Sequence, residues 1–438
     1  MFNKLFFSVS VTAFSLGFAQ KINTQKLDQY FKTLDENHKV MGSFAIADKG
    51  KIIYTNALGF ADVESKKKAD INTVYRIGSI TKTFTAVLVM KAVEDKKLSL
   101  DTKLSAFYPE IENAKNITVE QLLQHRSGIH NLTDEAEFGS YYTRPQSEDQ
   151  LVSIIKKYKS DFPPGSQYAY SNSNYILLGF ILEKIYKKSY AQLIQEKIAQ
   201  PLQLTRTQVG GKTEVSKNQA YSYQYLGSYL PFPETDMSVP VGAGNIISTP
   251  YELLQFIISL EEGKLIKKET LHQMKNFLDD YGYGIISTSF EKHQGFGHNG
   301  GIDGFQSSLY YFPDLKTGVS FVTNQSNYDH EDIFKKMMEA ALGKDFEIPD
   351  FKEIAVKENV LKKYEGVYKA EEFPLDIKIF IENKVLKGQA TGQAAFPLKA
   401  LSETEFEFDL AGIRLKFDAD KKTMDFSQGA NQLIFKKQ

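Results

Sequence analysis

The sequence predicts an α/β domain followed by a small antiparallel β domain, and three observations indicate this. Long apolar stretches with good helix formers, typical of buried helices, cover residues 80–93, 175–185 and 250–260. Short apolar runs bounded by turn residues, typical of strands, lie before and after them. Beyond Ile348-Pro349, apolar and polar residues alternate with period two, as in an antiparallel sheet with one buried face. We therefore place a domain boundary near residue 350.

Short sequence signals predict individual hairpins, helices and strands along the chain. Residues 44–47 and 52–54 flank Asp48-Lys49-Gly50, which predicts a hairpin. Thr118 followed by Gln121 predicts a capping box at a helix start. Two strands are expected at 307–311 and 319–323, and then a helix at 332–342 that ends at Gly343. The expected C-terminal strands carry alternating apolar residues at 375–381, 406–410 and 413–417.

Composition excludes several classes of function. The chain has 438 residues, a formal net charge of −1 and no cysteine. Without a basic surplus, neither nucleic acid nor an anionic membrane is an expected partner. Without cysteine, thiol catalysis, disulfides and thiolate metal sites are excluded. No His-Glu-x-x-His cluster and no glycine-rich phosphate loop occurs, so we expect neither a metal nor another cofactor.

The first 19 residues have the pattern of a secretory signal peptide. Lys4 supplies the positive charge, an apolar run covers residues 5–18, and small residues end at Ala19. The run is short for a membrane span, and no later segment is apolar for long enough. We expect cleavage after Ala19, a mature chain beginning at Gln20, and a periplasmic or extracellular location.

One Ser-x-x-Lys sequence stands in a context suited to catalysis. The spacing occurs four times, at Ser65, Ser79, Ser153 and Ser289, but only Ser79 follows a glycine and opens an apolar helix. Residues three apart share a helix face, so the Lys82 amine can reach the Ser79 hydroxyl. Burial would lower the pKa of that amine toward that of a useful base. The alternative is that Ser79 only caps the helix and Lys82 extends to solvent.

Two further sequences could complete a site. Tyr170-Ser171-Asn172 enters an apolar helix after a turn-rich stretch, so a phenol and an amide could project into a cleft. Gly297-His298-Asn299-Gly300-Gly301 precedes a strand, and its glycines would let a substrate backbone approach closely. His298 could bind an anion or act as an acid or base.

Taken together, the order Ser-x-x-Lys, Tyr-x-Asn and His-x-Gly resembles the three motifs of the penicillin-recognising serine hydrolases. This superfamily contains class C β-lactamases, D-alanyl-D-alanine carboxypeptidases, esterases and D-amino-acid peptidases. Further similarities are Leu122–Gly128, Gly242–Thr249 and Gly304-Phe305. The resemblance covers roughly residues 25 to 345. It implies an antiparallel sheet flanked by helices, with a helical lobe, and the site between them. The following domain is expected to be antiparallel β, and barrel-like is one possibility for it.

The resemblance also implies roles. Ser79 would be the acylated nucleophile, Lys82 its base and Tyr170 a proton carrier. Asn172 would bind the substrate amide and orient Lys82. The backbone N–H groups of Ser79 and Gly301 would form the oxyanion hole, with Gly300 beside them.

One position departs from many β-lactamases, which carry lysine where this chain has His298. A free histidine has a pKa of about 6.5, so it would hold a substrate carboxylate by full charge only in mildly acidic conditions. Nearby, His125 and Ser127 are expected to be buried and structural. The tyrosines at 221, 223, 225 and 229 either wall the substrate pocket or pack under a loop.

The favoured function is therefore an exported serine hydrolase, working through an acyl-enzyme on amide or ester bonds. Its substrate would be a D-amino-acid peptide, a β-lactam or a small ester. The rival is a binding protein: a β-lactam sensor without turnover, a pseudoenzyme or an assembly protein. A sensor usually needs a membrane span, and a pseudoenzyme is expected to lack a catalytic residue, whereas all the named positions carry competent groups.

Overall fold

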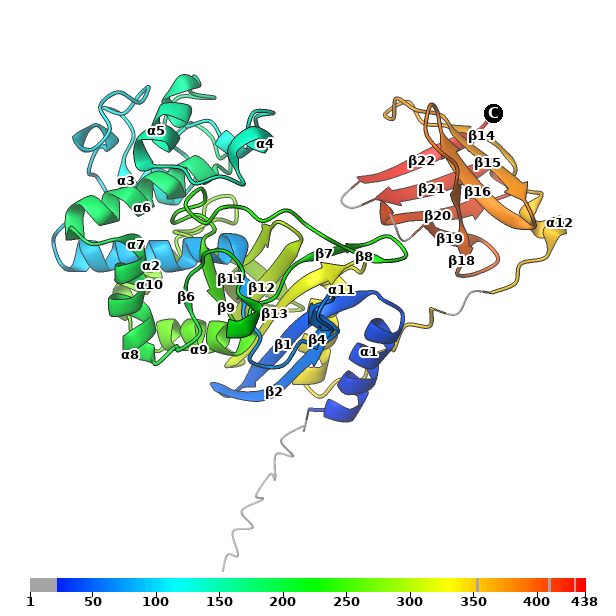
Figure 1. Cartoon of the computed structure of the whole chain (residues 1–438), viewed down its shortest axis with the longest axis horizontal. Coiled ribbons are helices and arrows are strands. Elements are labelled where there is room, and N and C mark those ends of the chain that lie inside the picture. Colours follow the sequence, from blue (N-terminus) through cyan, green and yellow to red (C-terminus); the bar gives the residue numbers. More distant parts are fainter. Residues whose placement is uncertain (1–21, 352–353, 409–410, 429–430) are drawn as a thin grey trace, which may run out of the picture.

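The computed structural model describes residues 22–351, 354–408, 411–428 and 431–438. The expected signal peptide, residues 1–19, lies outside this range. Two antiparallel sheets organise the described chain, one built from residues 40–326 and the other from residues 366–437 (Figure 1). The predicted fold, an antiparallel sheet flanked by helices plus a C-terminal antiparallel β unit, is confirmed.

The main sheet has six strands in the order β10-β11-β12-β13-β1-β2. Their bounds are β10 Ile286–Phe290, β11 His293–Ile302, β12 Phe305–Phe312, β13 Thr317–Ser326, β1 Val40–Asp48 and β2 Lys51–Leu58. The predicted hairpin joins β1 to β2, with Asp48 opposite Lys51. On its other edge β1 pairs with β13, so the first described strand lies beside the strand of this sheet that comes last in sequence.

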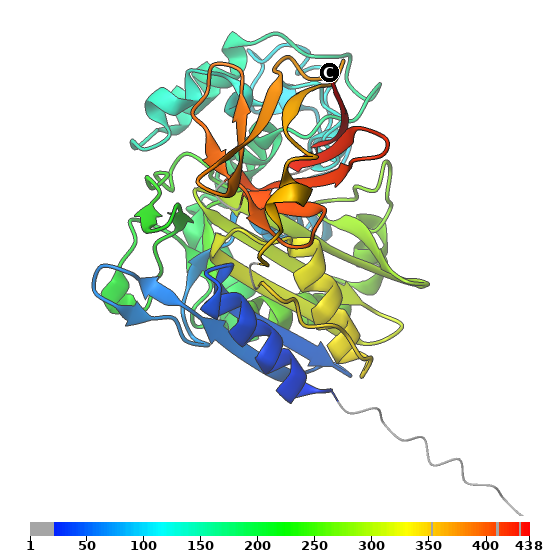
Figure 2. The same cartoon turned by 90° about the vertical axis from the view of Figure 1, so that its right-hand side faces the viewer.

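Helices cover both faces of this sheet. Successive residues of β1 point to opposite sides, so they pack into two different cores. Phe44 and Ile46 pack with the helices α1 (Thr24–Glu36) and α11 (His330–Ala341), which lie together on one face (Figure 2). Ala45 and Ala47 belong to the larger core on the opposite face.

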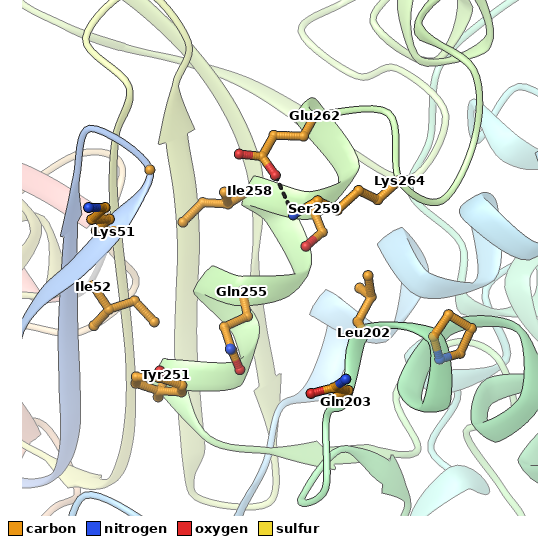
Figure 3. A pocket seen from close by; sticks show the side chains of 12 residues that line it. Lys51, Ile52, Leu202, Gln203, Tyr251, Gln255, Ile258, Ser259, Glu262 and Lys264 are labelled. Carbon is orange, nitrogen blue, oxygen red and sulfur yellow. Dashed lines mark ion pairs between the residues drawn. The ribbon is translucent and has the colours of Figure 1, made fainter.

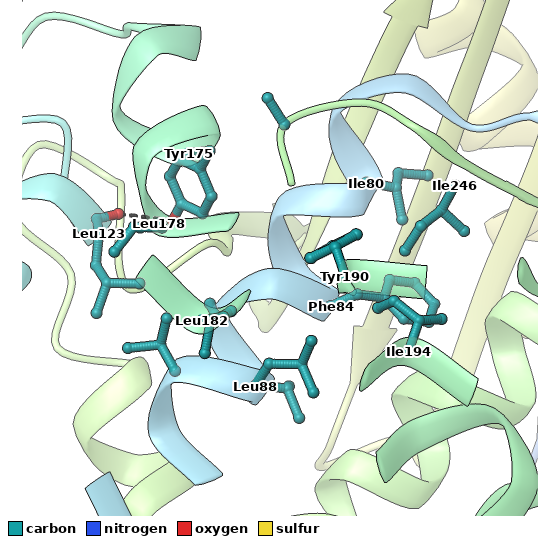
Figure 4. Close-up of a cluster of buried hydrophobic side chains, with 14 of the residues drawn as sticks. Ile80, Phe84, Leu88, Leu123, Tyr175, Leu178, Leu182, Tyr190, Ile194 and Ile246 are labelled. Atoms are coloured by element: carbon teal, nitrogen blue, oxygen red, sulfur yellow. Dashed lines mark hydrogen bonds between the residues drawn. The ribbon is translucent and has the colours of Figure 1, made fainter. Parts of the chain in front are cut away.

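The larger core surrounds α2 (Thr81–Glu94), which is buried on almost every side, as its apolar sequence predicts. Its neighbours are α6 (Asn172–Tyr186) and α9 (Pro250–Glu261). Phe84 of α2 stacks on Phe256 of α9 with ring centroids 3.8 Å apart. Figure 4 shows Ile80 beside Ile246, and Phe84 near Tyr190 and Ile194 of α7 (Tyr190–Ile194). This packing fixes the start of α2, where Ser79 and Lys82 stand.

The remaining elements before residue 345 are short. The helical lobe contains α3 (Val119–Leu123), which opens with the predicted Thr118–Gln121 capping box, α4 (Phe138–Tyr141) and α5 (Glu148–Lys157). Other helical segments are η1 Gly78–Ile80, η2 Leu104–Ala106, η3 Leu132–Asp134, α7 Tyr190–Ile194, η4 Gln195–Ala199, α8 Gln200–Leu202, η5 Val215–Lys217 and α10 Lys268–Met274. Short strands are β3 Phe60–Asp62, β4 Lys67–Lys68, β5 Tyr75–Arg76, β6 Gln208–Val209, β7 Tyr223–Tyr225, β8 Tyr229–Pro231 and β9 Ile246–Ser248.

The C-terminal sheet is antiparallel and has its own core, as the alternation after residue 349 predicts. A short helix, α12 (Glu358–Leu361), precedes it. Its nine strands follow the order β17-β16-β15-β14-β22-β21-β20-β19-β18. Their bounds are β14 Gly366–Lys369, β15 Ile377–Glu382, β16 Val385–Ala390, β17 Phe396–Pro397, β18 Lys399–Ala400, β19 Glu405–Phe408, β20 Ile413–Asp418, β21 Thr423–Gln428 and β22 Asn431–Lys437. Leu410, expected on one strand, lies outside the described residues.

A buried ion pair connects the two sheets' regions. Lys39 Nζ lies 3.3 Å from Glu407 Oε1, and both side chains are only 3% exposed. The same ammonium lies 4.7 Å from the centre of the Phe351 ring. Within the described ranges, none of the helices is both long and apolar enough to cross a membrane.

Candidate active site

Ser79 lies in η1, a 3₁₀ turn that leads directly into α2. Gly78 gives the chain its sharp entry, since its φ of +51° is a conformation that favours glycine. Lys82 follows in the first turn of α2, and its Nζ is 3.0 Å from Ser79 Oγ. Of the four Ser-x-x-Lys sequences, the one chosen from context thus forms a serine–lysine contact.

The Lys82 amine is fully buried and has three polar neighbours. Besides Ser79, Asn172 Oδ1 lies 2.8 Å and the Ala243 carbonyl oxygen 2.9 Å from Nζ. Burial lowers the pKa of Lys82 well below its usual value. A neutral amine has two N–H groups, which these two carbonyl oxygens accept, and one lone pair. The lone pair is then left for the Ser79 hydroxyl, so Lys82 is arranged as a base.

Tyr170 approaches the same hydroxyl from the segment before α6. Its phenol O–H donates to Ser79 Oγ at 2.7 Å. Burial raises the pKa of Tyr170 above its usual value, so the phenol keeps its proton. Ser79 Oγ therefore has a proton donor on one side and a proton acceptor on the other.

Asn172 begins α6 and is held from two directions. Its backbone N–H donates to Asn131 Oδ1 at 2.9 Å, and its Nδ2 donates to Thr133 Oγ1 at 3.1 Å. These contacts fix the orientation of the amide, so its carbonyl oxygen faces Lys82. The expected orienting role of Asn172 toward Lys82 thus has a geometric basis.

His125 fixes the segment that carries Tyr170. Its backbone carbonyl accepts the Ala169 N–H at 3.0 Å, and its Nδ1 accepts the Ser171 N–H at 3.1 Å. Both residues next to Tyr170 therefore hydrogen-bond to His125. The centroids of the His125 and Tyr170 rings lie 4.3 Å apart. The expected burial of His125 and Ser127 is confirmed. Sequence reasoning missed the purpose of His125, because nothing near it in the sequence connects it to Tyr170.

The glycines of the third motif let β11 approach η1 closely. A Cβ atom on Gly300 would lie 2.3 Å from the Ile77 carbonyl oxygen and 2.8 Å from Ser79 N. A Cβ atom on Gly78 would lie 2.8 Å from Gly301 N. Only glycine fits these two contacts, and they bring the backbone nitrogens of Ser79 and Gly301 to the same small region.

His298 is buried and uses both ring nitrogens within the protein. Nδ1 lies 2.5 Å from the Asn299 carbonyl oxygen, which can only accept, so Nδ1 carries the proton. Nε2 then accepts the Tyr281 hydroxyl at 3.0 Å. Burial and the neighbouring Lys82 lower the pKa of His298 to about 3. Burial, the larger cause of this shift, thus favours the neutral ring, in contrast to the expected full charge in mildly acidic conditions.

These groups border an open groove of about 700 Å³. Ser79, Tyr170, His298, Gly300 and Gly301 line it, together with side chains of β12 and the start of α11. Lys82 and Asn172 are absent from its lining and lie behind the serine. Among the described residues, no three carboxylate or histidine side chains are grouped so as to hold a metal ion.

The tyrosines at 221, 223, 225 and 229 are absent from the groove lining as well. Tyr225 stacks on His38 with centroids 4.8 Å apart, and Tyr229 packs on Tyr225. Tyr223 donates to Asp62 at 3.1 Å. Of the two expected roles, the packing role is the one that the structure supports.

A separate hollow of about 610 Å³ lies beside α9 (Figure 3). Tyr251, Gln255 and Ser259 of α9 line it together with Ile52 of β2. A Lys264–Glu262 ion pair of 2.6 Å stands at its rim. Among the described residues, the Ser259 hydroxyl forms no hydrogen bond with a basic side chain, so this hollow offers no counterpart to the Ser79 arrangement.

The part of the chain that matches a known family contains this site. The family described as Beta-lactamase matches residues 27–342. Penicillin-binding protein 4* of Bacillus subtilis is 25% identical over 446 residues, covering 94% of this chain and 98% of that protein. Teichoic acid D-alanine hydrolase of Staphylococcus aureus is 27% identical over 309 residues, covering 67% of this chain and 75% of that protein.

Solved structures give the same result. The octameric penicillin-binding protein homologue from Pyrococcus abyssi has a TM-score of 0.67 and 26% identity, covering 94% of this chain and all of that one (100%). D-amino acid amidase from Ochrobactrum anthropi SV3 has a TM-score of 0.63 at 22% identity, covering 72% of this chain and 98% of that one, and shows likeness of fold. With a family match over residues 27–342 and a serine–lysine–tyrosine cluster within it, the chain belongs to the beta-lactamase family.

Proposed function

We propose that this protein is a serine hydrolase that cleaves amide or ester bonds through an acyl-enzyme on Ser79. One observation carries the proposal: Ser79 Oγ lies 3.0 Å from the buried Lys82 amine and 2.7 Å from the Tyr170 hydroxyl. An unactivated serine hydroxyl is a weak nucleophile, and a base within hydrogen-bond reach is what it needs. The catalytic residues are Ser79, Lys82 and Tyr170.

The reaction would proceed in two halves. In acylation, Lys82 takes the hydroxyl proton as Ser79 Oγ attacks the substrate carbonyl carbon. The backbone N–H groups of Ser79 and Gly301 stabilise the resulting oxyanion. Tyr170 donates its proton to the leaving nitrogen or oxygen as the scissile bond breaks, and the Lys82 ammonium restores that proton.

In deacylation, water attacks the ester carbonyl carbon of the acyl-enzyme. Its proton passes to the Tyr170–Lys82 pair and then to Ser79 Oγ as the acyl bond breaks. The products are a carboxylic acid and the free enzyme, and no cofactor takes part.

The remaining assignments of the site follow from the same arrangement. Asn172 orients Lys82 and binds the substrate amide, and Gly300 with Gly301 lets the substrate backbone approach the oxyanion hole. His298 contributes a neutral wall of the groove rather than a charge. We also propose that residues 20–349 form the hydrolase unit, residues 350–438 an accessory unit, and residues 1–19 a cleaved export signal, which places the enzyme outside the cytoplasm.

The substrate bond is an amide or ester of a D-amino acid. The similarity to a teichoic acid D-alanine hydrolase, and the likeness of fold to a D-amino acid amidase, support this class. A penicillin-binding relative makes β-lactams a second compound class to test.

The decisive experiment is rapid-quench kinetics with D-alanine p-nitroanilide, a p-nitrophenyl ester and a penicillin. We expect repeated turnover of the anilide or the ester by the wild type, and none by Ser79→Ala. Ser153→Ala is the matched control, because Ser153 has the same Ser-x-x-Lys spacing on α5 and is exposed. A lasting adduct without product release for every compound would instead indicate a β-lactam-binding sensor and would overturn the proposal.

A further inference from the structure

Asn172 is held in place by a segment that belongs to none of the three motifs, residues 130–135. Asn131 Oδ1 accepts a hydrogen bond from the Asn172 backbone N–H at 2.9 Å, and Thr133 Oγ1 accepts one from Asn172 Nδ2 at 3.1 Å. The Asn172 carbonyl oxygen in turn accepts a hydrogen bond from Lys82 Nζ at 2.8 Å. The position of this segment therefore sets the orientation of Asn172 and, through it, the place of the Lys82 amine.

The two ends of this segment are joined by the His130 side chain. His130 Nε2 lies 3.0 Å from Glu135 Oε1, and this contact closes residues 130–135 into a loop. His130 Nδ1 lies 2.8 Å from Asp161 Oδ1, which connects the loop to a later part of the chain. Asp161 is itself fixed, because its backbone N–H donates to the Gly128 carbonyl oxygen at 2.9 Å. One imidazole ring thus restrains the loop that contacts Asn172.

The surroundings of this ring favour its protonated form. Both ring nitrogens face a carboxylate, and an ionised carboxylate can only accept hydrogen bonds. The imidazolium has an N–H for each carboxylate, whereas the neutral ring has one N–H and turns a lone pair toward the other. Partial burial lowers the pKa of His130, but the hydrogen bonds and charges of Asp161 and Glu135 outweigh it and raise this pKa above its ordinary value.

The other groups beside the ring do not compete for this proton. The centroid of the Tyr158 ring lies 5.0 Å from that of His130, and the Tyr158 hydroxyl donates to Glu137. This hydrogen bond raises the pKa of Tyr158, so the phenol stays neutral near pH 7. Glu137 also pairs with Lys157 at 2.7 Å. These three groups keep their charge near neutral pH, so the charge of this cluster there changes with His130.

We propose that His130, protonated between its two carboxylates, is a positioning residue for Asn172, and that loss of this proton slows the reaction at Ser79. The deprotonated ring keeps one of its two hydrogen bonds, so the loop holds Asn172 and the Lys82 amine less firmly. His130 is absent from the groove lining and acts only through Asn172. This inference rests on the proposed function and adds a pH dependence to it: the loop is fully restrained below the pKa of His130 and loosens as pH rises through it.

Nitrogen-15 NMR of the histidine rings measures this proton directly. We expect the His130 ring to titrate with a pKa above about 6.5, the ordinary value of histidine. His130→Gln identifies the signal by its absence. Glu135→Gln should lower the pKa of His130, because it removes one of the two negative charges beside the ring.

Kinetics then test the consequence for catalysis. Glutamine is uncharged and keeps one donor and one acceptor, so His130→Gln mimics the deprotonated ring at every pH. The ratio of kcat/KM between wild type and His130→Gln cancels the titration of the substrate and of Lys82. We expect this ratio to be about three to ten below the pKa of His130, the effect of one lost hydrogen bond, and to fall to about one above it. Asp161→Asn, which removes the other charge, should likewise converge with the wild type at high pH.

The matched control is His293→Gln. His293 Nδ1 also lies beside a carboxylate, 2.5 Å from Asp314 Oδ2, and its side chain is 18% exposed, similar to the 22% of His130. It stands at the start of β11 and outside the groove lining. The ratio of kcat/KM between wild type and this variant should stay the same at every pH.

Failure of the inference and failure of the proposed function give different results. Ser79-dependent turnover with a pH-independent ratio for His130→Gln, or a His130 pKa at or below about 6.5, overturns the inference alone. A folded wild type that turns over neither the p-nitrophenyl ester nor the p-nitroanilide overturns both.

Discussion

Replacing Lys82 with methionine separates the chemistry of the site from its packing. Methionine fills the buried space with an unbranched apolar chain but has no nitrogen to accept the Ser79 proton. A positioned general base contributes about 10²–10⁴-fold to rate, so kcat/KM for a p-nitrophenyl ester should fall by at least about 10²-fold. Lys82→Arg should be equally inactive, since a guanidinium does not release its proton at neutral pH.

The stability change in Lys82→Met should be modest. The variant leaves Asn172 Oδ1 and the Ala243 carbonyl oxygen without their donor, at about 1–3 kcal/mol each. It also removes the penalty of burying an amine, which offsets part of that loss. We therefore expect the free energy of unfolding, from urea denaturation, to change by less than about 3 kcal/mol.

The matched control for this prediction is Lys156→Met. Lys156 stands three residues after Ser153 on α5 and is exposed, so this variant should keep wild-type rate and stability. A Lys82→Met protein that folds and hydrolyses the ester within tenfold of the wild-type rate would refute the assignment of Lys82 as the base.

Three further predictions address the neighbours of the nucleophile. Gly300→Ala should abolish activity or folding, because the new Cβ would lie 2.3 Å from a backbone oxygen. In Gly301→Ala the nearest backbone oxygen would lie 3.9 Å from the new Cβ, so this variant should give a wild-type circular dichroism spectrum and melting curve. His125→Ala should lower kcat more than it raises KM, because the Ser171 N–H next to Tyr170 loses its side-chain acceptor, while the backbone bond to Ala169 remains. Steady-state kinetics and a change in the alkaline limb of the pH profile check this. Between pH 6.5, the ordinary pKa of histidine, and about 3, His298 binds a proton in the unfolded chain but not in the folded state. The free energy of unfolding therefore falls by about 1.4 kcal/mol for each pH unit by which the pH is lowered in this range. Urea titrations between pH 6 and 4 should therefore show a shallower slope for His298→Gln, and an unchanged slope would contradict the assignment.

Much of the fold was predictable because its signals are local. The helix that carries Lys82 is mostly apolar, and several C-terminal strands alternate buried and more exposed residues, so both can be recognised from neighbouring residues in the sequence. The nucleophile was also predictable, because a glycine before Ser79 and an apolar helix after it distinguish one Ser-x-x-Lys from three accidental ones. The family resemblance supplied the arrangement of an antiparallel sheet flanked by helices, which periodicity does not specify.

The parts that could not be predicted depend on contacts between distant residues. Tyr281 belongs to no motif, yet it occupies Nε2 of His298 and, with burial, keeps that ring neutral. The histidine in the third motif therefore suggested a charge that its surroundings remove. The pairing of Lys39 with Glu407 joins residues 368 positions apart, and neither residue is unusual in the sequence.

The proposed mechanism depends on acylation of the Ser79 hydroxyl group. Peptide mapping by mass spectrometry tests this acylation most directly. The protein is mixed with a slowly hydrolysed acyl donor, quenched in acid and digested, and the modified residue is located. We expect the acyl group on Ser79 in the wild type and in Lys156→Met, and no adduct in Ser79→Ala. An adduct on a different residue, or an unchanged adduct in Ser79→Ala, would contradict the central claim.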